Sequence, residues 1–179
     1  MTERALIEGC INKKRDCQKL LFDRFAGKMM SVCLRYANDE HLAQDILQEG
    51  FIRLFACIHQ YKFEGSFEGW MRRVFVSIAT RQLSKQKIIF SDIDIANVKD
   101  NSVDPNVFSK MSEDEIHLMI RNMPEGYRIV FNLNIIEGYS HEEIAAMLGI
   151  QATTSRGQLL KARKYLQTLI VKKYNTVKI

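Results

Sequence analysis

The stretch Met147–Arg163, MLGIQATTSRGQLLKAR, decides the fold because it describes one helix, a sharp turn and a second helix. Gly149 can adopt the left-handed conformation in which a helix ends and the chain reverses. Small hydroxyl residues and Arg156 then open the second helix, before its apolar positions begin. Two helices joined by a turn with glycine are the signature of a helix-turn-helix, so we expect that motif here.

The start of the second helix indicates contact with duplex DNA. A helix that enters the major groove by its N-terminus needs short donors close to the phosphates and one long donor for a base edge. Arginine can bind guanine with two hydrogen bonds, and glutamine can pair with adenine. The expected contact residues are Thr153, Thr154, Ser155, Arg156, Gln158, Lys161 and Arg163. A helix hairpin with a solvated basic face is the alternative.

The chain has 179 residues and a net charge of +5, which is distributed unevenly. Six cations against two carboxylates give +4 over residues 62–90, and seven against two give +5 over residues 140–179. Between these blocks, three cations against eight carboxylates give −5 over residues 91–125. Two basic blocks around an acidic one suit a polyanion that is contacted at two places.

Helical periodicity dominates the chain, with apolar residues at three- and four-residue steps. It predicts helices through residues 1–88 and again through residues 112–179. Residues 89–111 are acidic, contain Pro105 and show no sustained period. We therefore expect an all-α protein with two small helical domains, a linker over 89–111, and the helix-turn-helix in the C-terminal domain.

Local signals mark several helix boundaries. Ser112 with Glu115, and Ser140 with Glu143, have the spacing of capping boxes. Residues 129–136, IVFNLNII, fit a strand as well as a helix. Because the chain offers no partner strand, we expect a helix there.

A polar strip stands out in DILQEGFIRLF, residues 45–55. Its members are Asp45, Gln48, Glu49 and Phe51. An acidic strip beside an aromatic residue suits docking against a basic helix of a partner protein. An ordinary solvated helix face fits the spacing equally well.

Aromatic and basic residues interleave over residues 63–87. Aromatic platforms beside cations suit unstacked bases and a single-stranded backbone. The candidate residues are Phe63, Phe67, Arg73, Arg81 and Lys85. Alternatively, Phe67 and Trp70 belong to the core, on a helix over about residues 67–85 that turns Trp70, Val74 and Ile78 inward.

The sequence shows no catalytic, cofactor or metal site. The four cysteines stand singly, without a CxxC pair, so we expect buried, reduced thiols. Without a nucleophile–base pair or paired acids, we expect no enzymatic activity, no cofactor, no metal and no small-molecule substrate. No apolar run approaches the roughly eighteen residues that span a bilayer, and no signal peptide is seen, which predicts a cytoplasmic protein.

Three segments resemble the extracytoplasmic-function (ECF) sigma factors, the two-domain branch of the bacterial sigma-70 family. LLFDRFAGKMMSVCLRYANDEHLAQDILQEGFIRLF, residues 20–55, is similar to the segment that binds core RNA polymerase. FEGSFEGWMRRVFVSIATRQL, residues 63–83, is similar to the segment that melts and reads the minus-ten promoter element. MPEGYRIVFNLNIIEGYSHEEIAAMLGIQATTSRGQLLKARKYL, residues 123–166, is similar to the domain that reads the minus-thirty-five element. GSFEGW and TSRGQLLKARKYL most resemble members from Bacteroidetes.

The resemblance implies a role for each candidate surface. The strip of Asp45, Gln48, Glu49 and Phe51 matches positions that engage the clamp helices of the polymerase β′ subunit. The expected minus-ten contacts are Phe63, Phe67, Arg73, Ser77, Arg81 and Lys85, with Ser77 where many members have Asn facing a flipped base. The expected minus-thirty-five contacts are Thr153, Thr154, Arg156, Gln158, Lys161 and Arg163, with Gln158 where Arg is frequent.

The family implies a dissociable subunit that directs core RNA polymerase to specific promoters and initiates transcription. Its implied partners are the β′ clamp helices, the β flap, promoter DNA and an anti-sigma factor, often membrane-bound. Two other classes of protein stay open from the residues alone. One is an autonomous helix-turn-helix regulator whose first domain dimerises, and the other is a helical adaptor that never meets nucleic acid.

Overall fold

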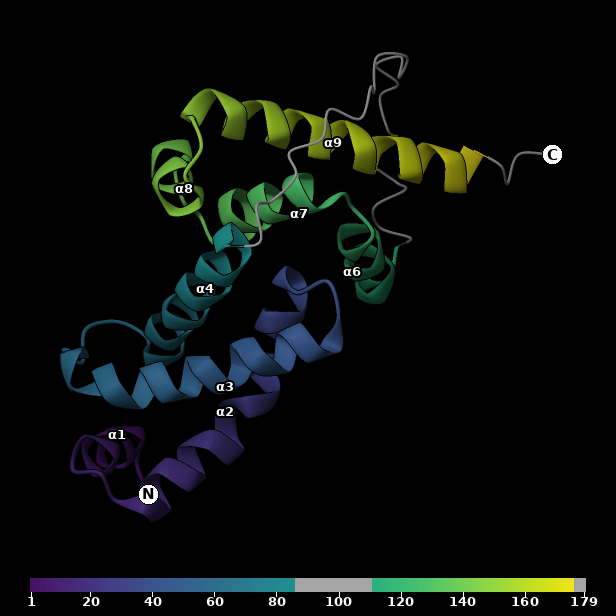
Figure 1. Ribbon diagram of the computed structural model, residues 1–179. Coiled ribbons are helices and arrows are strands. Elements are labelled where there is room, and N and C mark those ends of the chain that lie inside the picture. The colour runs from purple at the N-terminus through teal and green to yellow at the C-terminus, as the bar shows by residue number, and fades with distance from the viewer. Residues whose placement is uncertain (86–110, 176–179) are drawn as a thin grey trace. The chain divides into compact units, whose positions relative to one another are not determined.

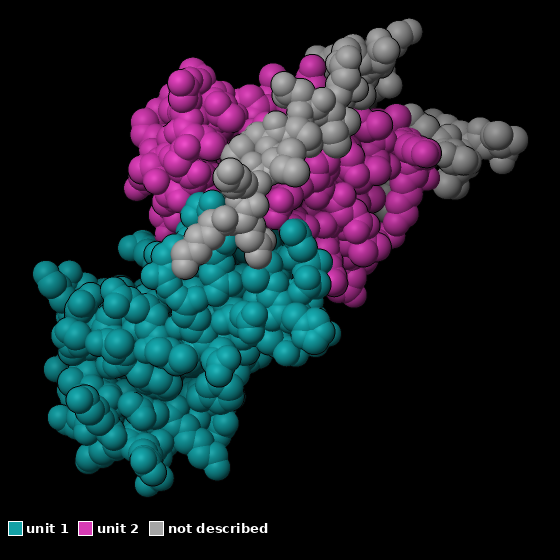
Figure 2. Space-filling view, in the orientation of Figure 1, with its two compact units in different colours: residues 1–86 teal, residues 87–179 magenta. Residues whose placement is uncertain are grey.

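A computed structural model of the chain describes residues 1–85 and 111–175, and every element in these two ranges is helical (Figure 1). The contacts divide the chain into two compact units, Met1–Gln86 and Lys87–Ile179 (Figure 2). The expected all-α fold with a C-terminal helix-turn-helix is therefore confirmed. The linker that we predict over 89–111 lies, except for Met111, outside the described residues.

The first unit consists of four α-helices and one short 3₁₀ helix. In chain order they are α1 (Glu3–Ile11), α2 (Arg15–Tyr36), α3 (Glu40–Cys57), η1 (Ile58–Gln60) and α4 (Phe67–Lys85). The Asp39 side chain caps α3, because its Oδ1 accepts a hydrogen bond from the Leu42 backbone N–H at 2.8 Å. Helices α2, α3 and α4 all pack on one another around the core.

The contact between α3 and α4 is unusually close at Gly50. A Cβ atom at Gly50 would lie 2.3 Å from the Phe75 ring, so only glycine fits there. The absence of a side chain lets the fully buried Phe75 lie directly on the backbone of α3. This approach also brings the exposed edges of the two helices near each other.

The buried face of α4 differs from our expectation. Its core residues are Phe67, Met71 and Phe75, whereas Trp70 and Val74, which we placed inward, are only half-buried. Ile78 is buried as expected. The prediction was wrong by one residue because α4 carries apolar side chains on two neighbouring faces, and the spacing fits both.

Burial also sets the chemistry of the cysteines. Cys10, Cys17, Cys33 and Cys57 are all buried and free, as expected for reduced thiols. Burial raises the pKa of Cys10 to about 11 and that of Cys33 to about 12. These two thiols therefore stay protonated at neutral pH, and a protonated thiol is a poor nucleophile.

The second unit contains five described helical elements. They are α6 (Glu113–Arg121), α7 (Glu125–Phe131), the π-helix η2 (Asn132–Ile136), α8 (His141–Leu148) and α9 (Ala152–Asn175). Both capping boxes are confirmed: Ser112 with Glu115 opens α6, and Ser140 with Glu143 opens α8. Helices α6, α7 and α8 all contact the long helix α9 (Figure 1).

The segment IVFNLNII is helical, as expected. Helix α7 continues directly into η2, and Leu133, Ile129 and Val130 are fully buried. The chain leaves η2 through Gly138, which has a φ of 79°. Because apolar residues occupy consecutive positions of this buried helix, their spacing alone resembled that of a strand.

Candidate nucleic-acid interface

The helix-turn-helix is built by α8 and α9. Gly149 ends α8 in the left-handed conformation, with φ 67° and ψ 35°, as its place in the sequence predicts. The Ile150 backbone N–H then donates to the Ala145 carbonyl at 3.1 Å, which closes the turn. Helices α8 and α9 pack on each other, and Leu148 of α8 and Leu159 of α9 are both buried.

The exposed face of α9 is basic near its N-terminus. Thr153, Arg156, Leu160 and Arg163 recur at three- and four-residue steps and are all exposed. Lys164 is exposed beside Arg163. Thr154 and Lys161, two further expected contacts, are half-buried. The face thus offers a hydroxyl group, cations and one apolar side chain to a ligand.

Two of the expected contact residues point to the protein interior instead. Gln158 is only 4% exposed, and Ser155 is fully buried with its Oγ 2.9 Å from His141 Nδ1. Both stand on the inward stripe of α9 that also contains Leu159 and Ala162. Our assignment of Gln158 to a base and of Ser155 to a phosphate was therefore wrong, because we placed polar side chains outward by default.

Sequence reasoning missed Leu160. Its side chain is 57% exposed, one helical turn after Arg156 and on the same face. We passed over it because apolar residues of a helix are normally assigned to the core. The signal was nevertheless present, because a step of four from Arg156 leads to Leu160 and a step of two to Gln158.

Consecutive residues at the start of α8 contact consecutive residues of α9. His141 Nδ1 lies 2.9 Å from Ser155 Oγ, and Glu142 Oε1 lies 2.6 Å from Arg156 Nη2. The His141 pair is largely enclosed, whereas the side chains of Arg156 and Glu142 are 53% and 66% exposed. The first turn of α8 thereby fixes the position of the first turns of α9.

The polar residues of the strip on α3 are accessible to a partner. Asp45 and Gln48 are exposed, and Glu49 is half-buried. Phe51, however, is only 4% exposed and packs on the Phe75 ring at a centroid distance of 5.1 Å. Phe51 is therefore a core residue, and our expectation of an exposed aromatic there was wrong.

An exposed aromatic residue does lie next to Phe51, but it comes from α2. The ring centroids of Phe22 and Phe51 are 4.7 Å apart, and Phe22 is 41% exposed. Ile52 of α3 is also exposed. Because α2 and α3 pack on each other, their surface combines polar groups of α3 with these apolar side chains.

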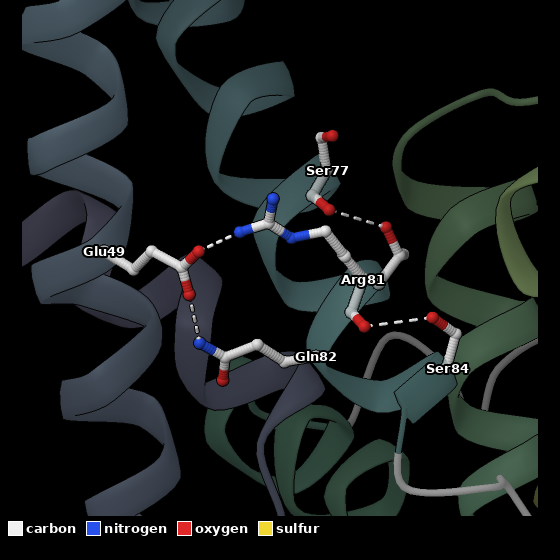
Figure 3. A network of polar contacts seen from close by, with 6 residues as sticks. Glu49, Ser77, Arg81, Gln82 and Ser84 are labelled. Atoms are coloured by element: carbon white, nitrogen blue, oxygen red, sulfur yellow. Dashed lines mark hydrogen bonds and ion pairs between the residues drawn. The ribbon is translucent and has the colours of Figure 1, made fainter.

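Glu49 joins α3 to the C-terminal part of α4 (Figure 3). Its Oε1 pairs with Arg81 Nη2, and its Oε2 accepts a hydrogen bond from Gln82 Nε2 at 2.6 Å. Both carboxylate oxygens are thus engaged within the unit. A residue that we expect to bind polymerase and one that we expect to bind DNA are partners of each other.

Helix α4 presents a regular exposed face. Arg73, Ser77 and Arg81 are spaced by four residues, and all three are exposed. Lys85, the last residue of α4, continues this spacing, but its side chain is outside the described part of the structure. The helix therefore offers two cations and a hydroxyl group along one side.

The two expected stacking aromatics differ in their surroundings. Phe63 is partly exposed, has a φ of 60°, and lies 5.2 Å from the Tyr61 ring between centroids. Phe67 is only 1% exposed and packs edge-on against Phe25. Phe67 is therefore in the core and offers no face to a base, so that expectation was wrong and the alternative reading was right for Phe67, though not for the half-buried Trp70.

Within residues 1–85 and 111–175, no group of three or more histidine, cysteine, aspartate or glutamate residues is placed to hold a metal ion. In the same ranges, no helix has both the length and the apolar character to cross a bilayer.

Comparison with known protein families matches both units. Residues 21–88 match the model of sigma-70 region 2, and residues 113–166 match that of sigma-70 region 4. Together the two matches cover more than half of the chain. The region 2 match includes α3 and α4, and the region 4 match includes the helix-turn-helix.

Curated relatives agree with these matches. The ECF RNA polymerase sigma-E factor of Haemophilus influenzae is 26% identical over 182 residues, which cover 95% of this chain and 96% of that protein. The ECF RNA polymerase sigma factor SigE of Mycolicibacterium smegmatis is 26% identical over 157 residues, which cover 85% of this chain and 61% of SigE.

A solved structure supports the fold. CnrH, solved in complex with the cytosolic domain of CnrY, is similar with a TM-score of 0.50 and 18% sequence identity, over 94% of this chain and 96% of that one. The two family regions stand in the expected order along the chain, and the sigma-E factor of Haemophilus influenzae matches almost end to end. The chain belongs to the sigma-70 family and is an RNA polymerase sigma factor of the ECF type.

Proposed function

We propose that this sigma factor reads promoters with two separate helix faces, one on α4 and one on α9. The observation that carries the proposal is the pair of exposed basic stripes: Arg73, Ser77 and Arg81 in the first unit, and Arg156 and Arg163 in the second. Each stripe alone offers few contacts and binds weakly. When core polymerase holds both units at a fixed spacing, their affinities reinforce each other.

Helix α9 enters the major groove at the minus-thirty-five element. Arg156 binds guanine O6 and N7, while Arg163 and Lys164 contact phosphates on the flanks. Thr153, in the first turn of α9, donates to a phosphate together with free backbone N–H groups. The exposed Leu160 side chain is suited to the 5-methyl group of a thymine, which is the apolar feature of that groove.

Helix α4 captures the unpaired strand of the minus-ten element. Arg81 and Arg73 attract the backbone, and Phe63 offers a partly exposed ring for a base. The Ser77 hydroxyl donates to a base that has left the stack. Capture of this kind offsets the few kcal/mol that unstacking costs per base.

Core polymerase binds the surface formed by α2 and α3. The acidic and polar groups of Asp45, Gln48 and Glu49 suit the basic side of a β′ clamp helix. Phe22 and Ile52 supply apolar area beside them, which an interface core requires. The second unit contacts the β flap, as the family resemblance implies.

An anti-sigma factor covers this sigma factor until a signal arrives. The proposal draws on CnrH, which was solved in complex with the cytosolic domain of CnrY. We infer a membrane-bound anti-sigma factor, a cytoplasmic location, and an initiation role without catalytic activity of its own. The likeness of GSFEGW and TSRGQLLKARKYL to members from Bacteroidetes stays a prediction about the origin of the chain.

Transcription in vitro tests the proposal. Purified core polymerase, mixed with this chain and a library of random promoters, should transcribe only templates that share two upstream elements at a fixed spacing. An autonomous regulator, the less favoured reading, would bind duplex DNA as a dimer without polymerase. An adaptor would show no salt-dependent DNA binding at all.

A further inference from the structure

We propose that Glu142 is a positioning residue for Arg156 and thereby sets the selectivity of the minus-thirty-five contact. This inference rests on the proposed function, in which Arg156 reads a guanine. Glu142 itself contacts no base. Its carboxylate holds the guanidinium of Arg156 on the exposed face of α9, through the 2.6 Å contact between Oε1 and Nη2.

The exposure of this ion pair argues against a role in stability. Both side chains are more than half exposed, and exposed pairs of this kind contribute little to folding. The contact instead fixes the orientation of the Arg156 guanidinium. Arginine is a planar fork of N–H donors, so anchoring one nitrogen orients the plane and leaves the remaining donors for a base edge.

The neighbouring contacts fix the backbone that carries Glu142. Glu143 Oε2 accepts from the Ser140 backbone N–H at 2.7 Å, and the Ser140 hydroxyl accepts from the Glu143 N–H, which fixes the first turn of α8. His141 then binds the buried Ser155. Of the two adjacent glutamates, one caps α8 and the other is free to face Arg156.

A carboxylate at this place has an electrostatic cost. DNA is a polyanion, so Glu142 repels every duplex to a similar extent, whatever its sequence. Its presence on a DNA-binding face is useful only if it improves discrimination between sequences. Affinity and selectivity should therefore change in opposite directions when the side chain is cut back to a group that can no longer hold Arg156.

The test uses holoenzyme assembled from core polymerase and the full chain, with promoter fragments in which each minus-thirty-five base pair is varied in turn. Four variants are compared with the unmodified chain: Glu142→Ala, Glu142→Gln, Arg156→Ala and Asp114→Ala. Asp114, exposed on α6, is the control for the loss of one negative charge from the same unit. Binding is measured at two salt concentrations.

Glu142→Ala should bind non-cognate DNA at least as tightly as the unmodified chain. Its discrimination should fall by about three- to tenfold, at the base pair where Arg156→Ala loses discrimination, which is a part of what one bidentate arginine contact supplies. Glu142→Gln keeps an acceptor oxygen without the charge, so it should retain most of the discrimination. Asp114→Ala should leave the discrimination unchanged.

Two outcomes overturn the inference, and they can be told apart. If Arg156→Ala loses discrimination at one base pair while Glu142→Ala keeps it, Glu142 does not position Arg156, and the proposed function stands. If Arg156→Ala loses no discrimination anywhere although the holoenzyme still needs the element, the assignment of Arg156 to a base falls, and the inference falls with it.

Discussion

Each unit of the molecule holds an arginine of its proposed DNA-binding face against a glutamate from another helix, but the two pairs differ in what surrounds them. Glu142 binds Arg156 with one oxygen. Glu49 binds Arg81 with one oxygen and Gln82 with the other. Of the two glutamates, only Glu49 also belongs to the strip that we expect to bind polymerase.

A similar ion pair can therefore either persist during DNA binding or be broken when a partner protein binds. In the second unit, arginine and glutamate lie on one surface, and the pair can persist while DNA binds. In the first unit, a basic helix of polymerase that takes Glu49 competes with Arg81 for the same carboxylate. We therefore expect polymerase docking to release Arg81 for the DNA strand, which changes to either residue should reveal.

Glu49→Lys should have the largest effect on this comparison. It reverses the charge at position 49, which leaves Asp45 and the new lysine to cancel each other in the docking strip, and it places a cation against Arg81. Core binding should therefore weaken by about 2–5 kcal/mol. Co-purification with core polymerase, followed by competition titration, measures the loss. Circular dichroism should show that the helical fold persists, because the side chain is partly exposed.

Arg81→Ala is the matched control, because it breaks the same ion pair from the other side. It should leave core binding intact, since Glu49 keeps its charge and becomes more available. An equal loss of core binding in Arg81→Ala and Glu49→Lys would mean that the ion pair itself shapes the docking surface. Unchanged co-purification of Glu49→Lys would remove Glu49 from that surface altogether.

Gly50→Ala tests whether the close approach of α3 and α4 supports the Glu49 contact. The new Cβ would lie 2.3 Å from Phe75, and such overpacking typically costs about 1–3 kcal/mol of unfolding free energy. Urea unfolding followed by fluorescence reports on this unit, because Trp70 in α4 is the single tryptophan of the chain.

Gly27→Ala provides the matched comparison for the glycine change. Gly27 lies on the exposed side of α2, and a Cβ there meets nothing within 4 Å. The substitution should stabilise the unit by up to about 1 kcal/mol through helix propensity. If Gly50→Ala also stabilised the unit, the tight packing between α3 and α4 would be contradicted.

Features that depend on a few neighbouring residues could be predicted from the sequence. The capping boxes at Ser112 and Ser140 and the left-handed Gly149 are all where local chemistry places them. Each requires only hydrogen bonds or backbone freedom within one helical turn. The same locality explains why α4 begins at Phe67, as expected, after a Ser66 hydroxyl that accepts from the Gly69 backbone N–H.

Features that depend on tertiary packing could not be predicted in the same way. Phe51 and Phe67 are in the core because other helices cover them, and the spacing of an apolar-rich helix does not say which face is covered. Gln158 is buried, although glutamine side chains are usually exposed to solvent. The partners Glu49 and Arg81 stand 32 residues apart, so no local pattern connects them.

Comparing Arg156→Ala with Arg163→Ala distinguishes a base contact from a phosphate contact in the second unit. Loss of Arg156 should cost about 1–3 kcal/mol at one cognate base pair and little elsewhere, because its fork reads a base. Loss of Arg163, exposed two turns further along α9, should weaken binding to all sequences alike and reduce the salt dependence. Equal losses on every sequence for both variants would make Arg156 a phosphate contact.

Leu160 gives the smallest and most specific prediction. If its exposed side chain covers a thymine methyl, replacing that thymine by uracil should cost about 0.8 kcal/mol, the value of one buried methyl-sized group. Leu160→Ala should lose the same amount on thymine and become indifferent to the replacement. The measurement is holoenzyme binding to promoters with uracil at each thymine of the minus-thirty-five element in turn. A Leu160→Ala variant that still distinguishes thymine from uracil as the unmodified chain does would show that another residue makes the contact. Because Leu160 is exposed, its loss should not affect folding, so the effect on recognition can be measured alone.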